Sequence, residues 1–183
     1  MSGLDGARVL LLAAGRGRRA GGPKAWREYE GTTMLEAQLA FFRGLVGDHG
    51  LSVSIQNDWH ARCSELSHDV TWVSTDPDAS PLSSLQSLIS ASPAARSFVL
   101  HVDMPIFVRG IYEDLWTLKE DAVAPVFDGH RGHPVLLSPK SLAEIAKLDP
   151  ATDRLDHWLR GHHVREAKVE TGVIHLNLNE PGA

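Results

Sequence analysis

The feature that most constrains the fold is a short apolar run that ends in glycines. The run extends from Val9 to Ala14, and the strand predicted from it begins at Arg8. It is far shorter than the ~20 apolar residues that a membrane-spanning helix requires. Continuous apolar strands are typical of the centre of a parallel sheet, where helices cover both faces. We therefore predict that residues 8–14 form a central, buried β-strand.

Beyond this run, apolar segments of strand length alternate with segments of helical length, which is the pattern of α/β proteins. Further strands are predicted at residues 51–55, 70–73, 97–102, 122–127, 133–137, 164–169 and 173–178. The connection at 128–132 is too short for a crossover, so the strands on either side of it must be antiparallel. Residues 1–183 are predicted to form a single three-layer αβα Rossmann-like domain. Its sheet is mostly parallel, with one antiparallel excursion.

Several predicted helices begin at residues that suit the first turn of a helix. Thr33 and Glu36 have the spacing of a capping box. Asp58 is predicted to cap a short helix that ends at residue 66. Ser80 followed by Pro81 predicts a helix through residue 89, because proline fits the first helical position. Later helices are predicted at residues 108–118, from residue 138 onward, and at residues 153–159.

The composition argues against several classes of protein. A formal net charge of -5 argues against broad nucleic-acid binding, which needs a basic face to neutralise phosphates. The single cysteine, Cys63, cannot form an internal disulfide. The N-terminal residues lack the pattern of a signal peptide and no membrane anchor is predicted, so a cytoplasmic protein is expected. Basic residues gather in one stretch that indicates a small polyanionic ligand: Arg16, Arg18, Arg19, Lys24 and Arg27.

The glycine-rich loop at residues 13–24 follows the first strand, and its glycines would let backbone amides approach a phosphate closely. A dinucleotide-binding loop must open directly into a helix, which Gly21, Gly22 and Pro23 interrupt. A Walker loop requires its lysine directly after the last glycine, whereas Pro23 stands before Lys24 here. A flexible turn without a ligand would explain the glycines but not the cationic residues among them.

The loop and several later segments resemble the MobA-like nucleotidyltransferases. The signature positions of the loop are occupied by Leu12, Ala13, Ala14, Gly15, Gly17, Arg19, Gly21, Pro23 and Lys24. Further segments match the family in the same order along the chain: residues 83–85, 103–105, 132–135 and 177–181. The resemblance implies a fold of the nucleotide-diphospho-sugar transferase type and a magnesium-dependent nucleotidyl transfer.

The resemblance also implies roles for individual residues around the triphosphate. The amides of Gly15 to Gly17 would hold the phosphates, Arg19 would clamp the outer ones, and Lys24 would neutralise charge between the α-phosphate and the attacking group. Arg19, Lys24 and Asp103 are thus the candidate catalytic residues. The candidate nucleotide-binding residues are Leu12, Ala13, Ala14, Gly15, Gly17, Arg19, Lys24, Ser84 and Asp103.

The remaining implied roles concern the metal and the acceptor. Asp103 and Asn179 are the candidate ligands of Mg²⁺, which prefers oxygen and usually takes only one or two carboxylates from the protein. His133 is the candidate acceptor-binding residue, and a structural role for it stays equally open. Arg16 and Arg18 are expected to be solvated surface charges.

The reaction that the resemblance implies moves a nucleoside monophosphate from CTP or GTP to a small phosphorylated acceptor, molybdopterin in this family. The Leu-Ala-Ala-Gly form of the loop at residues 12–15 favours CTP, whereas Asn177 and Asn179 resemble the guanylyl branch. Two alternatives stay open. One is a transferase that acts on a sugar phosphate or another small acceptor, and the other is a nucleotide-binding protein that has lost turnover.

Overall fold

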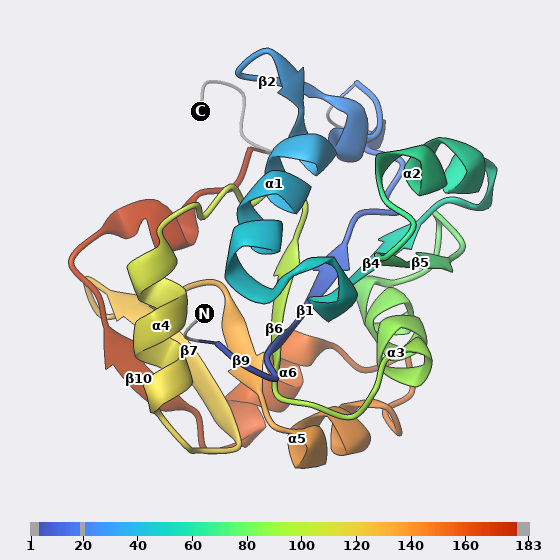
Figure 1. Cartoon of the computed structure of the whole chain (residues 1–183). Coiled ribbons are helices and arrows are strands. Elements are labelled where there is room, and N and C mark those ends of the chain that lie inside the picture. Colours follow the sequence, from blue (N-terminus) through green and yellow to red (C-terminus); the bar gives the residue numbers. More distant parts are fainter. Residues whose placement is uncertain (1–3, 19–20, 179–183) are drawn as a thin grey trace.

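The computed structural model describes residues 4–18 and 21–178 and has one sheet between two layers of helices (Figure 1). The strands are β1 (Arg8–Leu12), β4 (Leu51–Ile55), β5 (Thr71–Ser74), β6 (Ser97–His101), β7 (Ala122–Phe127), β8 (His130–Arg131), β9 (Val135–Leu137) and β10 (Arg165–Lys168). Their order across the sheet is β10-β7-β9-β6-β1-β4-β5, and β8 pairs with the end of β7. β1 is parallel to both neighbours, β4 and β6, as expected for the first strand.

The antiparallel excursion is confirmed, and the structure assigns it to β9. This strand runs antiparallel to β6 on one side and to β7 on the other. β10 then pairs parallel with β7 at the edge of the sheet. Because β9 runs against its neighbours, the residues just before it lie at the same edge of the sheet as the residues just after β6.

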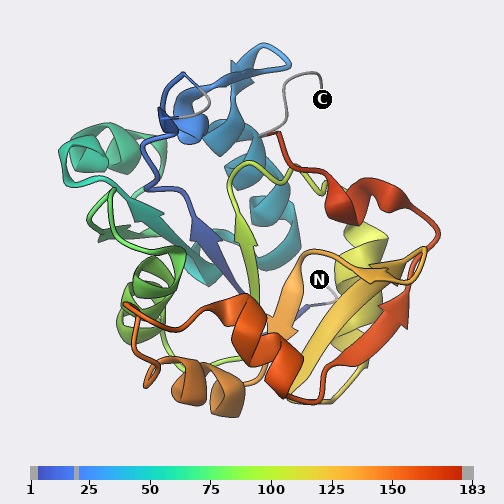
Figure 2. The same ribbon diagram turned by 180° about the vertical axis from the view of Figure 1, so that it is seen from behind.

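The helices are α1 (Met34–Val46), α2 (His60–Leu66), α3 (Pro81–Ala91), α4 (Arg109–Thr117), α5 (Pro139–Ile145) and α6 (Leu155–Gly161). Successive residues of a strand point to opposite faces, so β1 contributes Val9 and Leu11 to one core and Leu10 and Leu12 to the other. The first core is covered by α1 and α4, and the second by α3, α5 and α6, which Figure 2 shows from behind. No helix in the described part of the chain is long and apolar enough to cross a membrane.

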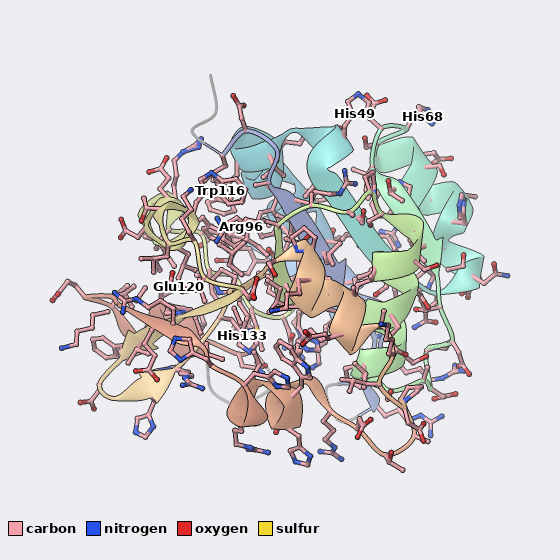
Figure 3. The ribbon with its side chains drawn as sticks, turned by 90° about the horizontal axis from the view of Figure 1, so that it is seen from below. His49, His68, Arg96, Trp116, Glu120 and His133 are labelled. Carbon is pink, nitrogen blue, oxygen red and sulfur yellow. The ribbon has the colours of Figure 1, made fainter. Side chains whose placement is uncertain are left out.

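Three of the predicted helix starts have the expected caps, and at one of them the Ser138 hydroxyl accepts from the Ser141 amide at the start of α5. Thr33 accepts a hydrogen bond from the Glu36 amide while the Glu36 carboxylate accepts one from the Thr33 amide, which is a complete capping box. Ser80 caps α3 through the amide of Ser83. The start of β6 is tied to the end of α4 by Arg96, whose guanidinium lies over the Trp116 ring (Figure 3).

Asp58 does not cap α2, and this prediction was wrong. Residues Asn57–Trp59 form a separate 3-10 turn, and α2 begins only at His60. Trp59 is the N-cap residue, and no side chain makes a capping hydrogen bond there. The turn bonds its Trp59 amide to the Gln56 carbonyl, which moves the start of the helix beyond the reach of the Asp58 side chain.

The strand predicted at residues 173–178 was also wrong. Gly172–His175 form a 3-10 helix, η5, capped by the Thr171 hydroxyl. The carbonyl of Ile174 accepts from the amide of His133, so this segment bonds to a loop rather than to the edge of the sheet. A Cβ atom on Gly132 would lie 2.5 Å from that carbonyl oxygen, so the close approach requires glycine.

A small hairpin that was not predicted lies between the first loop and α1. It consists of β2 (Glu28–Tyr29) and β3 (Thr32–Thr33). Its two turn residues, Glu30 and Gly31, have φ angles of 49° and 84°. Strands of two residues carry too little periodicity to be found in a sequence.

Candidate functional site

The candidate residues gather at the carboxyl ends of the parallel strands, which is where ligands bind in open α/β sheets. The glycine-rich loop leaves β1 there, and Asp103 follows β6. His133 precedes β9, and the pairing of Val99 with Val135 brings it beside the end of β6. The loop, Asp103 and His133 therefore share one edge of the sheet.

The described part of the glycine-rich loop folds back on itself. The Gly22 amide donates to the Gly17 carbonyl at 3.1 Å, and Gly17 has a φ of 62°. A Cβ atom on Gly17 would lie 1.8 Å from the Gly22 oxygen, so no other residue fits here without moving the backbone. Pro23 then precedes a 3-10 helix, η2 (Lys24–Trp26), rather than the α-helix of a dinucleotide-binding loop. Arg19 lies outside the described residues.

The loop also begins at a fixed point. The Ala13 amide donates to the carbonyl of Ser54 at 3.2 Å and to its hydroxyl at 3.1 Å. Leu12 and Ala14 are buried on either side of it, whereas Gly15 is exposed. The chain thus becomes exposed at Gly15, where the backbone amides of the loop would have to face a ligand.

Lys24 and Asp103 form the closest ion pair between distant parts of the site. The Lys24 Nζ lies 2.6 Å from the Asp103 Oδ2, although the two residues are 79 positions apart. Only 4% of the surface of Asp103 is exposed, and the Lys24 side chain is about a quarter exposed. A buried carboxylate needs such a partner, because desolvation of an unpaired charge is costly. The pair joins the glycine-rich loop to the turn after β6.

The turn that carries Asp103 is held by a residue that sequence reasoning missed. The Gln38 side chain, fully buried in α1, donates through Nε2 to the carbonyls of Val102 and Met104 at 2.9 and 3.0 Å. These carbonyls lie on either side of Asp103. Gln38 stands where the apolar stripe of α1 faces the sheet, and a lone polar residue in such a stripe was the available signal.

The donor set around Asp103 fits a magnesium ion that is completed by phosphate oxygens. The described residues contain no group of three His, Cys, Asp or Glu side chains that could hold a metal by themselves. One buried carboxylate agrees with the way Mg²⁺ binds together with nucleotide phosphates. The Leu178 amide donates to the Asp103 carbonyl at 3.0 Å, which brings the closing segment to this turn. Asn179, the second candidate ligand, lies outside the described residues.

Arg16 and Arg18 are exposed, as expected, but both contact a carboxylate. Arg16 Nε lies 2.9 Å from each oxygen of Asp78, and Arg18 Nη2 lies 2.9 Å from one of them. Asp78 belongs to the loop between β5 and α3. This contact could not be predicted from the sequence, because the partners are about 60 residues apart.

The nucleotide-binding candidate Ser84 is buried in the first turn of α3, with its amide bonded to the Ser80 carbonyl at 3.1 Å. Two other polar side chains lie at the ends of neighbouring strands, Gln56 after β4 and Thr75 after β5. Gln56 Nε2 and Thr75 Oγ1 are buried and find no hydrogen-bond partner among the described residues. Unpaired buried polar groups are rare, so these two atoms are candidate contacts of a ligand.

His133 and His101 lie on the acceptor side of the edge, with ring centroids 6.5 Å apart. Burial, followed by the neighbouring His101, lowers the pKa of His133 to about 4, so its imidazole is neutral near pH 7. The His133 Nδ1 atom is buried without a hydrogen-bond partner among the described residues. Both rings line a cavity of about 630 Å³ that reaches α3 and α6. His101 was missed by sequence reasoning.

Known proteins share this arrangement of sequence and fold. Residues 9–167 match the family described as the MobA-like NTP transferase domain. The molybdenum cofactor cytidylyltransferase of Escherichia coli (strain K12) is 26% identical over 186 residues, covering 99% of this chain and 93% of that protein. Rv0371c from Mycobacterium tuberculosis H37Rv superposes with a TM-score of 0.71 at 24% identity, covering 89% of this chain and 87% of that one.

A second structure of Rv0371c is a complex with manganese. It superposes with a TM-score of 0.65 at 24% identity, covering 89% of this chain and 88% of that one. The family match spans most of the sheet, from β1 to β10, and includes the loop and the Asp103 turn. The chain therefore belongs to the MobA-like NTP transferase domain family and is a nucleotidyltransferase.

Proposed function

We propose that the protein transfers cytidine monophosphate from CTP to the phosphate of molybdopterin, with Mg²⁺ as its metal and with release of pyrophosphate. The observation that carries the proposal is the Lys24–Asp103 pair, which sets a cation and a buried carboxylate between the glycine-rich loop and the acceptor side. The choice of CTP and molybdopterin is supported by the loop sequence at residues 12–15 and by the resemblance to the cytidylyltransferase of Escherichia coli.

The main obstacle to the reaction is repulsion between two anions. A phosphate oxygen of the acceptor attacks the α-phosphorus of CTP, and the bond from that phosphorus to the oxygen bridging to the β-phosphate breaks. Pyrophosphate leaves with that oxygen. An ammonium carries three donors, so Lys24 can contact Asp103 and still donate to both reacting phosphates. Asp103 and Asn179 would hold Mg²⁺, which screens the charge of the triphosphate when bound.

The nucleoside side of the proposed site is built from the ends of β1, β4 and β5. The amides of Gly15 to Gly17 would bind the triphosphate, and Arg19 would bind its outer phosphates. Gln56 and Thr75, whose buried polar atoms find no partner among the described residues, would contact the base together with Ser84. A base would give these atoms the hydrogen bonds that the protein does not supply.

The acceptor side is the cavity lined by His101 and His133. Its walls combine aliphatic side chains, among them Leu82, Leu85 and Leu159, with charged ones such as Arg131 and Arg154. A pterin ring can place its faces against the aliphatic side chains while its polar edges and phosphate meet the polar and charged ones. The neutral His133 imidazole donates to the Val99 backbone, and its Nδ1 atom, which has no partner among the described residues, can accept a hydrogen bond from a polar ring edge. This mixed lining agrees with molybdopterin as the acceptor, and the acceptor panel below decides between it and a sugar phosphate.

Pyrophosphate release tests the proposal. The purified protein is mixed with Mg²⁺, each of CTP, GTP, ATP and UTP, and either molybdopterin or a panel of sugar phosphates. We expect the fastest release with CTP and molybdopterin. Faster release with GTP would overturn the choice of base. Release with a sugar phosphate but not with molybdopterin would overturn the acceptor, and nucleotide binding without release in any mixture would identify a protein without turnover.

Two aspartate variants test the metal assignment in the same assay. Asp103→Ala is expected to lower kcat by roughly 100- to 1000-fold, the loss seen when one preorganised group of an active site is removed. Asp78→Ala is the matched control, because Asp78 also contacts cationic side chains of the loop but is about half exposed. An Asp103→Ala variant as active as the wild type would remove Asp103 from the metal site.

A further inference from the structure

We propose that Arg27 is a positioning residue, whose guanidinium holds the closing segment of the chain, residues 176–178, against the Asp103 turn. The inference rests on the proposed function, because it assigns the segment before Asn179 to the metal side of the site. Arg27 was noted in the sequence only as one of a group of basic residues. Arg16, Arg18 and Lys24 each contact a carboxylate, whereas Arg27 contacts a backbone carbonyl distant in sequence.

The backbone at Arg27 is fixed on both sides. Its amide donates to the Lys24 carbonyl at 3.2 Å, which closes the turn of η2, and its carbonyl accepts from the Met34 amide at 2.8 Å, where α1 begins. The side chain therefore starts from the same short helix that carries Lys24. The position of its guanidinium is thereby coupled to the position of the catalytic lysine.

The guanidinium contacts the far end of the described chain. Arg27 Nη1 donates to the Leu178 carbonyl at 2.6 Å in a partly buried contact 151 residues apart in sequence. The amide of the same residue donates to the Asp103 carbonyl at 3.0 Å. Arg27 thus holds the carbonyl of Leu178, and the Asp103 turn holds its amide. Its side chain packs against the core beneath α1 and α4.

The closing segment approaches this point from η5, which is attached elsewhere. The Ile174 carbonyl accepts from the His133 amide at 2.9 Å, and the Leu176 amide closes the last turn of η5 onto Val173. From Ile174 onward the segment crosses from the acceptor side of the edge to the metal side. The hydrogen bond from Arg27 to the Leu178 carbonyl connects the closing segment to the short helix that follows the glycine-rich loop.

A tie at this place matters because magnesium tolerates little error in the positions of its ligands. The ion requires near-ideal octahedral geometry, so the turn that carries Asp103 must stay in place, and the Leu178 amide is one of the contacts that hold it. Residues that orient metal ligands without touching the metal typically contribute 10- to 100-fold to metal affinity or activity. We therefore expect the loss of Arg27 to affect the use of metal and not the binding of nucleotide alone.

The kinetic test uses Arg27→Ala, Arg27→Lys and a matched control, Arg109→Ala. Arg109 also donates to a distant backbone carbonyl, that of Gly44, at 2.9 and 3.2 Å, but on α4 and away from the sheet edge. Arg27→Ala should lower kcat and raise the Mg²⁺ concentration for half-maximal activity, each by roughly tenfold. The Kd of CTP without metal should stay within about twofold of the wild type. Arg27→Lys should recover part of the loss, and Arg109→Ala should change neither quantity.

Three results would overturn the proposal. An Arg27→Ala variant with unchanged kcat and unchanged metal requirement would show that the contact has no role in positioning. An equal loss of CTP affinity without metal would make Arg27 a direct phosphate ligand. Loss of activity in Arg109→Ala as well, with a matching fall in Tm, would mean that the effect comes from general destabilisation.

Amide hydrogen exchange gives a second measurement that does not need turnover. In the ligand-free protein, the Leu178 amide should exchange faster in Arg27→Ala than in the wild type, and at the wild-type rate in Arg109→Ala. If the Leu178 amide exchanges faster in Arg27→Ala and the wild type releases no pyrophosphate, the contact between Arg27 and Leu178 is supported but the proposed function is wrong. If the wild type releases pyrophosphate but the Leu178 amide exchanges at the same rate in Arg27→Ala, the proposed function stands and the positioning role of Arg27 is wrong.

Discussion

The triphosphate side and the Asp103 side of this site are built in different ways. The described glycine-rich loop owes its shape to its own backbone, as in the bond between Gly17 and Gly22, and its arginines are exposed. The Asp103 turn is buried and depends on Gln38 and Leu178, which come from opposite ends of the chain. A local loop can be recognised by its motif, whereas a buried turn held by distant contacts requires the fold.

The largest effect is expected where the two sides meet. Lys24→Met should lower kcat by roughly 100- to 1000-fold, because it removes the cation nearest to the proposed reacting phosphates. It also leaves the Asp103 carboxylate buried without this partner, so the free energy of unfolding should fall by on the order of 3 kcal/mol. Pyrophosphate release and urea unfolding measure the two effects. In Lys24→Met/Asp103→Asn most of the stability should return but not the activity, and a double variant as unstable as Lys24→Met would contradict this explanation.

The next effect tests whether the loop depends on its own backbone. Gly17→Ala should weaken CTP binding by more than about tenfold, because the added Cβ overlaps the Gly22 carbonyl and the loop must open. Gly21→Ala is the control, since Gly21 has a similar φ of 77° but no atom of the described residues within 4 Å of an added Cβ. Both variants should lose on the order of 1 kcal/mol of stability from the left-handed backbone. If calorimetry gives the same CTP affinity for Gly17→Ala and Gly21→Ala, the overlap with the Gly22 carbonyl does not affect CTP binding.

A pH effect is expected from the buried acceptor side. The pKa of His133 is lowered to about 4 in the folded protein, whereas an unfolded histidine titrates near 6.5. The unfolded state therefore binds more protons between these values, and the free energy of unfolding should fall as the pH drops from about 6.5 to about 4, on the order of 2 kcal/mol from this residue. His133→Gln should flatten that part of the curve. The exposed His68, seen at the periphery in Figure 3, supplies the control His68→Gln, which should leave the curve unchanged.

The smallest effect is expected at the exposed ion pairs of the loop. Asp78→Asn removes the partner of Arg16 and Arg18, and because these groups are about half exposed or more, stability should change by less than ~0.5 kcal/mol. CTP should bind up to about twofold more tightly at low salt, since the two arginines no longer contact a carboxylate. Calorimetry at two salt concentrations measures this. A weaker affinity would mean that Asp78 orders the loop for the ligand.

Much of the fold could be predicted because its signals are local. The continuous apolar run of β1, the capping box at Thr33 and the Ser80-Pro81 start of α3 each lie within a few residues, and each was confirmed. The two wrong predictions concern places where a nearby turn replaced the expected element. The 3-10 turn after Gln56 displaced the start of α2, and η5 replaced a last strand.

The sequence by itself determined the fold class, the two faces of the central strand and the glycine-rich loop, because periodicity, capping and glycine conformation act over a few residues. Only the tertiary structure decided that Lys24 meets Asp103, that His101 lies beside His133 and that Arg27 holds Leu178. These contacts depend on strand order and register. The free energy that fixes strand order comes from burying the whole sheet between its helices, and no short segment of the chain contains that information.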